Sequence, residues 1–183
     1  IPAYYKNEKK TKEAIDEDGW LRSGDIGMIL PGSNALKIFD RRKNIFKLSQ
    51  GEYIAPDKLE QAYKGAKGVG DIFVYGRSDK SHLVAVVNYD PEEIFSIAKS
   101  LEIGETEIEA LAQNSTLKEQ IHNELLATHK RNGLKGFERI KDFYVEPKTF
   151  EELGLITTSF KLKRHQAKEA FIDKIEQMYE GLD

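Results

Sequence analysis

The sequence contains no cysteine among its 183 residues. This absence excludes a disulfide framework, a thiolate metal site and a cysteine nucleophile, and it fits an intracellular setting. The longest apolar runs, such as Leu83–Val87, are far short of the roughly 20 residues that a helix needs to cross a bilayer. The first residues, Ile1–Tyr5, lead directly into sequence rich in Lys and Glu, so no secretory signal is visible.

An excess of charge of one sign is also lacking. The chain has 28 Lys and Arg against 31 Asp and Glu, which gives a formal net charge of -3. We therefore predict no nucleic-acid partner. The length fits one or two domains of roughly 100–200 residues each, with the composition of a soluble globular protein. The four histidines have no ligand spacing, so no metal site is predicted among them.

The stretch from Ile38 to Glu60 changes its pattern three times. A strand-like apolar run gives way to the charge cluster Asp40–Lys43, which cannot be buried without partners. Residues 45–54 then have the composition of a hairpin, with Gly51 free to adopt positive φ, and Pro56 opens a helix. The simplest interpretation is a junction between two folding units, with the charge cluster as solvated surface.

Before this junction, residues 6–18 favour a short exposed helix. The segment Trp20–Gly27 favours a turn that presents the carboxylate of Asp25 at the end of a strand. Such a carboxylate can accept hydrogen bonds from the vicinal hydroxyls of a ribose, and it can equally cap its own turn. Residues 26–30 and 36–39 then predict a small antiparallel hairpin around the turn 31–34.

After the junction, the composition is typical of an α/β (α+β) domain with a sheet of about three strands. The three apolar segments are Asp71–Tyr75, Leu83–Tyr89 and Ile140–Val145. The first two lack polar alternation, which predicts burial on both faces beneath covering helices. The predicted helices are 90–101, 105–112, 117–132 and 165–179, the last with its core face at Ala167, Ala170, Phe171, Ile175 and Met178.

Three stretches occur in an order that resembles the C-terminal motifs of the adenylate-forming superfamily, which includes acyl-CoA synthetases, luciferases and the adenylation domains of peptide synthetases. They are Trp20–Asp25, then Asp40–Lys43 with Phe46–Pro56, and finally Thr158–Arg164. Two features are most similar to the long-chain fatty acyl-CoA synthetase branch. They are the helical segment between about residues 90 and 135 and the amino-acid sequence of Phe46–Pro56. The resemblance covers essentially the whole chain.

The resemblance implies a division of the chain. Residues 1–42 would be the C-terminal edge of the large adenylate-binding domain, including its last β-hairpin, and residues 43–183 would be the small mobile C-terminal domain. The chain would then be a piece of a longer protein and inactive alone, because the family's phosphate loop, adenine motif and acyl pocket lie upstream.

The resemblance also implies roles for single residues. Asp25 matches the acid that holds the ribose hydroxyls of ATP and of the acyl-adenylate, and Arg41 matches an arginine that contacts ribose or phosphate. Lys43 matches the hinge residue. Gly51 lies in the hairpin that lines the pantetheine channel of CoA after the domain has rotated.

Lys161 matches the lysine that reaches into the active site during adenylation. Lys163 is a competing candidate for this role. Phe160 stands where many members of the superfamily have Gly, although the long-chain branch commonly has a bulky residue there. A carboxylate that attacks the α-phosphate brings two anions together, so an ammonium group is well suited to this step. Without the neighbouring motifs, Lys161 would be read as a solvated lysine.

The implied parent enzyme is an AMP-forming fatty acid:CoA ligase that uses a long-chain fatty acid, ATP and CoA, with Mg²⁺ bound mainly by the N-terminal domain. Its partners would be these substrates and its own N-terminal domain. The parent would be cytoplasmic, or associated with a membrane of the endoplasmic reticulum or another organelle through regions not present here. Two alternatives remain: another carboxylate-CoA ligase, such as a medium-chain or aryl acid synthetase, and a non-catalytic binding or regulatory module.

Overall fold

The computed structural model describes residues 3–182, and the contacts between them divide the chain after Ile45 into two units. Each unit is considered by itself. The predicted domain boundary between residues 42 and 43 remains a prediction about how the two parts move.

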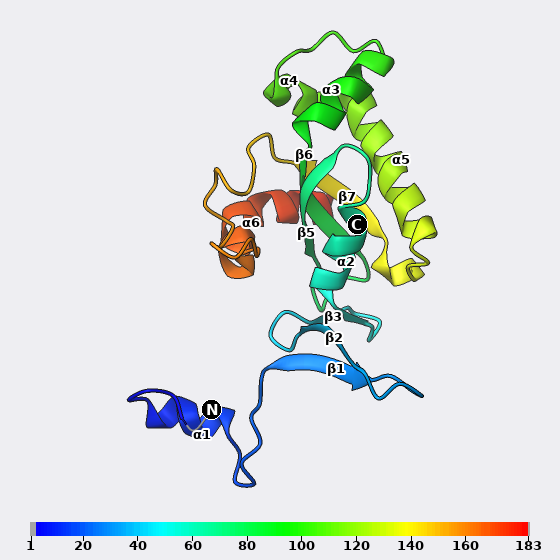
Figure 1. Cartoon of the computed structure of the whole chain (residues 1–183). Helices are drawn as coiled ribbons and strands as arrows, with labels where there is room; N and C mark the ends of the chain where they lie inside the picture. The colour runs from blue at the N-terminus through cyan, green and yellow to red at the C-terminus, as the bar shows by residue number, and fades with distance from the viewer. Residues whose placement is uncertain (1–2, 183) are drawn as a thin grey trace. The chain divides into compact units, whose positions relative to one another are not determined.

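The first unit contains a helix and a hairpin. The elements are α1 (Glu8–Ala14), β1 (Asp25–Ile29) and β2 (Leu36–Arg41), drawn at the blue end of the chain in Figure 1. Strands β1 and β2 are antiparallel, with Ile29 opposite Leu36, which confirms the predicted hairpin. The apolar hairpin surface, formed by Trp20, Ile29, Leu36 and Ile38, is at least half exposed at every one of these residues. A hairpin of two strands buries too little apolar surface to be stable alone.

The second unit is built around a three-stranded sheet. The strands of this unit are β3 (Phe46–Lys47), β4 (Tyr53–Ile54), β5 (Val69–Tyr75), β6 (Leu83–Tyr89) and β7 (Ile140–Val145). Strands β3 and β4 form a separate antiparallel hairpin, as predicted. The main sheet has the order β5-β6-β7, with β5 antiparallel and β7 parallel to β6. The predicted sheet of three strands is thus confirmed.

The helices of this unit are α2 (Pro56–Tyr63), α3 (Pro91–Ser100), α4 (Ile108–Gln113), α5 (Ser115–Arg131), the short 3₁₀ helix η1 (Gly136–Glu138) and α6 (Arg164–Glu180). Two parallel neighbours need a long crossover connection, and α3, α4 and α5 supply it between β6 and β7. The Asp90 carboxylate caps α3 by accepting from the Glu93 N–H at 2.9 Å. The helical segment that the sequence predicts after residue 90 is therefore the crossover of the sheet.

The sequence places the start of α4 three residues too early. The sequence predicted a helix from Glu105, but α4 begins at Ile108, with Glu107 in an extended conformation before it. The Glu105 carboxylate instead accepts a hydrogen bond from Asn114 Nδ2 at 3.0 Å. The acidic run before Ile108 is therefore used to link the loop to the start of α5.

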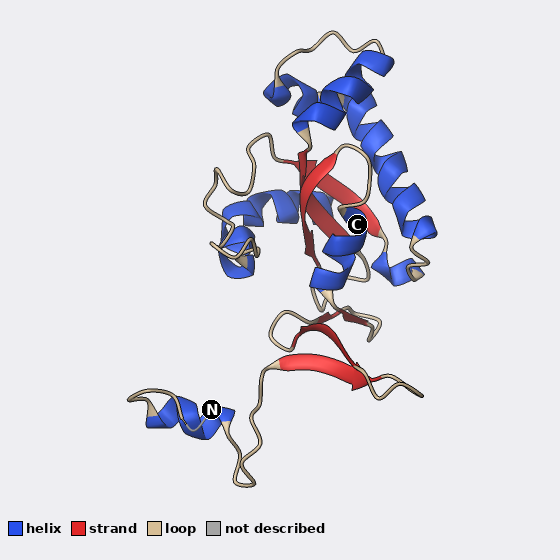
Figure 2. Ribbon diagram, in the orientation of Figure 1, coloured by secondary structure: helices blue, strands red, loops and turns tan. Residues whose placement is uncertain are grey.

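Strand β6 is buried along its whole length, and its side chains alternate between two cores. Leu83, Ala85 and Val87 pack in a core with residues of α2, α3 and α5. Val84 and Val86 pack in a second core with residues of α6. Figure 2 shows helices on both sides of the sheet. The prediction that helices cover both faces is confirmed.

Helix α6 buries a stripe of the predicted number of residues, in which Tyr179 takes the place of Ala170. Its buried residues include Ala167, Phe171, Ile175 and Met178, which are spaced by four, four and three positions. Ala170, predicted to face the core, is exposed. At 100° per residue, position 170 falls to the side of this stripe.

Substitution of Gly68 by Ala should destabilise the second unit by about 1–3 kcal/mol. Gly68 has φ +85, and an added Cβ would lie 2.7 Å from Ile121 Cδ1 and 2.9 Å from Ile97 Cδ1. The control is Gly104→Ala, because nothing lies within 4 Å of a Cβ built there and φ is not positive. Urea denaturation of both variants measures the difference. Equal stability of the two variants would contradict this account of the α2–β5 loop.

Candidate functional site

The structure brings Asp25 and Arg41 together on the hairpin of the first unit. The two residues are register partners at the end of the β1–β2 ladder. Arg41 Nε lies 4.0 Å from Asp25 Oδ1, and the two side chains are 55% and 36% exposed. An ion pair this open to water adds little stability. The pair therefore contributes little to holding the hairpin together. Its carboxylate and its guanidinium are both accessible to a ligand.

The alternative use of Asp25, as the cap of its own turn, is not what the structure shows. The turn before β1 is capped by Ser23, whose Oγ accepts a hydrogen bond from the Asp25 N–H at 3.2 Å. Within the part of the chain that the structure describes, the carboxylate of Asp25 contacts Arg41 and makes no hydrogen bond. Its oxygens can accept from hydroxyl groups of a ligand.

Lys43 lies in the exposed turn that follows β2. The turn is closed by the Asn44 N–H, which donates to the Arg41 carbonyl at 2.9 Å, and by Asn44 Nδ2, which donates to Asp40 Oδ1 at 3.0 Å. The charge cluster of residues 40–43 is thus partly organised by Asp40 and is not simply solvated surface. Lys43 lies two residues before Ile45, after which the contacts divide the chain.

Gly51 lies at the tip of the β3–β4 hairpin with φ +94, a conformation that favours glycine. Its N–H donates to the Leu48 carbonyl at 2.9 Å. The hairpin is fixed to the loop between β5 and β6, because the Ser49 N–H donates to the Lys80 carbonyl at 3.0 Å and Gln50 Nε2 donates to the Ser81 carbonyl at 3.0 Å. The tip at Gly51 is therefore held rigidly.

Lys161 belongs to a tight loop that ends at α6. We call residues 155–163 the Lys161 hairpin. Ile156 and Leu162 form an antiparallel bridge, and the Thr157 N–H donates to the Lys161 carbonyl at 2.8 Å. The Lys161 N–H in turn donates to Thr157 Oγ1 at 3.0 Å. These bonds order the backbone at Lys161 and leave its side chain in solvent.

The two candidate lysines differ in their contacts. Lys163 Nζ donates to the Gly154 carbonyl at 2.8 Å and is half-buried. Lys161 is exposed, and within residues 3–182 its ammonium makes no hydrogen bond or ion pair. An ammonium already committed to a carbonyl is less available to an incoming phosphate. The geometry thus favours Lys161 over Lys163 for contact with a ligand.

Phe160 is strained at the tip of the Lys161 hairpin. Its φ is +56 and its side chain is 84% exposed. Its N–H donates to the Thr157 carbonyl at 2.9 Å, and it is the last residue of the three-residue loop between Thr157 and Lys161, a place where such hairpins commonly have a left-handed residue. A left-handed conformation costs a bulky L-residue roughly 1–2 kcal/mol. This explains physically why Gly suits the same position.

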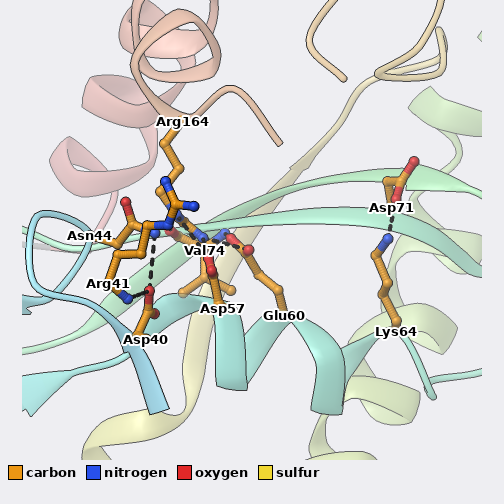
Figure 3. A network of polar contacts seen from close by, with 9 residues as sticks. All are labelled: Asp40, Arg41, Asn44, Asp57, Glu60, Lys64, Asp71, Val74 and Arg164. Carbon is orange, nitrogen blue, oxygen red and sulfur yellow. Dashed lines mark hydrogen bonds and ion pairs between the residues drawn. The ribbon is translucent and has the colours of Figure 1, made fainter. Parts of the chain in front are cut away.

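A charged network lies between α2, β5 and the start of α6 (Figure 3). Arg164 Nη2 donates to Glu60 Oε2, and both Nε and Nη2 donate to Asp57 Oδ1, at 3.3 and 3.2 Å. Glu60 Oε1 also accepts from the Val74 N–H at 2.8 Å. The side chains of Arg164 and Glu60 are only 17% and 9% exposed.

Burial raises the pKa of Glu60 to about 7 from its ordinary 4.5, while Arg164 and the Val74 N–H oppose this rise. Neither Glu60 nor Arg164 was predicted from the sequence as a site residue. The signal was present at Glu60, because this acid lies between Leu59 and Tyr63 on the buried face of α2. A carboxylate on such a face requires a cationic partner.

The predicted site residues fall into two groups. Asp25 and Arg41 contact one another in the first unit, while Gly51 and Lys161 lie at the tips of two separate hairpins of the second unit. The roles of these residues remain predictions.

A search against models of protein families returned no match. Among curated proteins, the chain is 49% identical over 181 residues to long chain acyl-CoA synthetase 6, peroxisomal, of Arabidopsis thaliana. It is 43% identical over 181 residues to long-chain-fatty-acid–CoA ligase 5 of Rattus norvegicus. Each match covers 98% of this chain but only 26% of the relative. The chain thus spans about a quarter of the length of these relatives.

Among solved structures, the adenylation domain of a carboxylate reductase from Mycobacterium chelonae has a TM-score of 0.83 and 38% identity, over 97% of this chain and 26% of that one. The corresponding domain from Segniliparus rugosus, in complex with AMP and a co-purified carboxylic acid, has a TM-score of 0.83 and 34% identity, over 100% of this chain and 27% of that one. These likenesses confirm the predicted fold and the predicted resemblance.

The contribution of Glu60 to stability should fall as the pH rises. Because the folded state binds this proton more tightly than the unfolded state, with pKa values of about 7 and 4.5, the free energy of unfolding decreases across this window. The loss amounts to about 3 kcal/mol. The measurement is urea denaturation of the wild type and of Glu60→Gln between pH 4.5 and 7.5; the free energy of unfolding of the wild type minus that of the variant should decrease as the pH rises. A difference that stays constant or grows with pH would contradict the raised pKa.

Proposed function

We propose that this chain, a homologue of one part of the long-chain acyl-CoA synthetases, acts within a protein that activates a long-chain fatty acid as its acyl-adenylate and transfers the acyl group to CoA. The observation that carries this proposal is the 49% identity over 98% of the chain. The whole ligase would need the preceding domain of the longer relatives. This chain alone would be inactive.

The chemistry of the two units fits an adenylate. In the first unit, the Asp25 carboxylate would accept hydrogen bonds from the ribose hydroxyls, and Arg41 beside it would contact ribose or phosphate. In the second unit, Lys161 offers an uncommitted ammonium group on an ordered hairpin. Together they supply an acceptor for the sugar and positive charge for the phosphate.

In the first half-reaction, an oxygen of the fatty acid carboxylate would attack the α-phosphorus of ATP, and the bond to pyrophosphate would break. Negative charge then accumulates on the phosphoryl oxygens, where the ammonium of Lys161 would stabilise it. Mg²⁺ would accompany the phosphates of ATP. We propose that its protein ligands lie mainly in the preceding domain.

In the second half-reaction, the sulfur of CoA would attack the acyl carbonyl carbon, AMP would leave, and the thiol proton would pass to solvent. The ammonium of Lys161 would then occupy space that CoA needs. A rotation about Lys43 would withdraw the Lys161 hairpin and bring in the Gly51 hairpin. The rigid anchoring of that hairpin to the loop between β5 and β6 supports its use as one wall of a channel.

The apolar hairpin surface of the first unit supports a covering partner. Trp20, Ile29 and Leu36 are between 66% and 72% exposed, which is unusual for large apolar side chains gathered on one small unit. The relatives are about four times longer than this chain, so a preceding domain of the same protein is the partner that we propose.

The location that we propose is intracellular, because one of the relatives is named as peroxisomal. Membrane association would depend on segments outside this chain. Among the described residues, no helix combines the length and the apolar character that a bilayer span requires.

A related function is adenylation of a carboxylic acid for an acceptor other than CoA. The similarity to carboxylate reductase adenylation domains, at 38% and 34% identity, favours this second candidate. The higher identity to CoA ligases, 49%, makes CoA the preferred acceptor. Formation of acyl-CoA by the longer protein would decide between the two.

Replacement of Lys161 by Ala should lower adenylation by about 10²–10³-fold, as expected for the loss of one charge that stabilises the transition state. Transfer from a supplied acyl-adenylate to CoA should be retained. The matched control is Lys163→Ala, because Lys163 Nζ is already bonded to the Gly154 carbonyl. Both half-reactions are measured separately in the full-length protein. An equal loss in both steps, or a larger loss in Lys163→Ala, would refute the role of Lys161.

Replacement of Lys43 by Pro should impair transfer to CoA more than adenylation. Proline fixes φ and restricts the residue before it, so a rotation at this turn would be hindered. We expect the second step to slow on the order of tenfold, or about 1.4 kcal/mol of barrier. Lys43→Ala is the control, since it removes the charge and keeps the backbone free. If Lys43→Pro slows both steps alike, Lys43 is not the hinge.

A further inference from the structure

Arg164 is the first residue of α6 and follows Lys161 by three positions. Its guanidinium is held by two acids of α2, Asp57 and Glu60, as Figure 3 shows. It also donates to the Val74 carbonyl of β5 at 3.4 Å and lies over the Phe73 ring, 5.6 Å from its centroid. One side chain therefore connects the start of α6 to two other elements.

The backbone of Val74 connects Glu60 to Arg164 a second time. Glu60 accepts from the N–H of Val74, whose carbonyl accepts from Arg164. The planar fork of an arginine is suited to this arrangement, because its five N–H groups have fixed directions and can meet several acceptors at once. A lysine would preserve the charge and lose the fork.

The Lys161 hairpin is fixed at both of its ends. At its beginning, Leu155 is 5% exposed and packs in the core beneath α6. The Lys163 N–H donates to the Leu155 carbonyl at 2.8 Å, which brings the two ends of the hairpin side by side. Arg164 comes next and attaches this closed base to α2 and β5.

A buried ion pair of this kind is a weak source of net stability, because the desolvation of the two charges offsets most of their attraction. What the network does provide is a defined geometry at the base of the hairpin. An error of about 1 Å in the placement of a reacting group can cost about 10²-fold in rate.

We propose that Arg164, held by Glu60 and Asp57, is a positioning residue for Lys161: it fixes the base of the Lys161 hairpin on α2 and β5, so that the ammonium group is presented in one place. This inference rests on the proposed role of Lys161 in adenylation. It assigns to Glu60 and Asp57 a part in the same site, although neither would touch the substrate.

The first test measures the hairpin directly, by amide hydrogen exchange in the full-length protein. Arg164→Ala should speed exchange at the Thr157 and Lys163 amides at least tenfold, and amides of β6 should change less than threefold. The matched control is Arg77→Ala, because Arg77 also pairs with a residue of α6, Glu176, at 2.6 Å, far along the helix from the hairpin. This control should leave the hairpin amides unchanged.

The second test separates the half-reactions. Arg164→Ala should reduce adenylation by about 10²-fold, with transfer from a supplied acyl-adenylate changed less than threefold. Arg164→Lys should recover at least tenfold of the lost adenylation, since the charge between Asp57 and Glu60 is restored. A role limited to stability would lower both half-reactions together and would show no such split.

Two results would overturn the proposal. One is an exchange rate of the hairpin amides that is unchanged in Arg164→Ala, or that rises no more than the exchange rate of the β6 amides. The other is a parallel loss of both half-reactions. If the wild-type protein forms no adenylate at all, the proposed function fails, while the exchange data still decide whether Arg164 orders the hairpin. If Arg164→Ala does not fold, Arg164→Lys is measured in the same way, with a smaller effect expected on the same amides.

Discussion

The complete burial of β6 is the constraint on which the second unit depends. A strand whose side chains on both faces are apolar must be covered on both sides. Residues of α2, α3 and α5 cover one face, and residues of α6 cover the other. Because β7 runs parallel to β6, the chain needs a long crossover, and the segment α3–α5 fills that role. Both hairpins of the site are attached to this frame.

The charged network at the start of α6 links this frame to the candidate chemistry. Glu60 is an acid on the buried face of a helix, and Arg164 is the cation that makes its burial tolerable. The same arginine directly follows the Lys161 hairpin. One side chain, Arg164, therefore pairs with the buried Glu60 and also positions Lys161. For this reason a change at position 164 would reduce adenylation more than transfer to CoA.

Much of this fold could be predicted from local patterns. The strands of the sheet were found from their β-branched runs, and the glycine at position 51 from the turn that needs it. The start of α4 and the exposure of Ala170 were not predicted, because both depend on contacts with residues elsewhere in the fold. The pairing of Glu60 with Arg164 spans 104 positions, so no local pattern could predict it. The roles of Asp25, Arg41, Lys43, Gly51 and Lys161 remain predictions.

We propose that this chain is one part of an AMP-forming ligase, in which its positive charges stabilise the adenylate. The most direct measurement is the exchange of labelled pyrophosphate into ATP, made with the full-length protein and a long-chain fatty acid in the absence of CoA. The account predicts exchange that requires the fatty acid, because the first half-reaction is reversible and complete without CoA. Absence of exchange in a protein that is folded and binds ATP would contradict it.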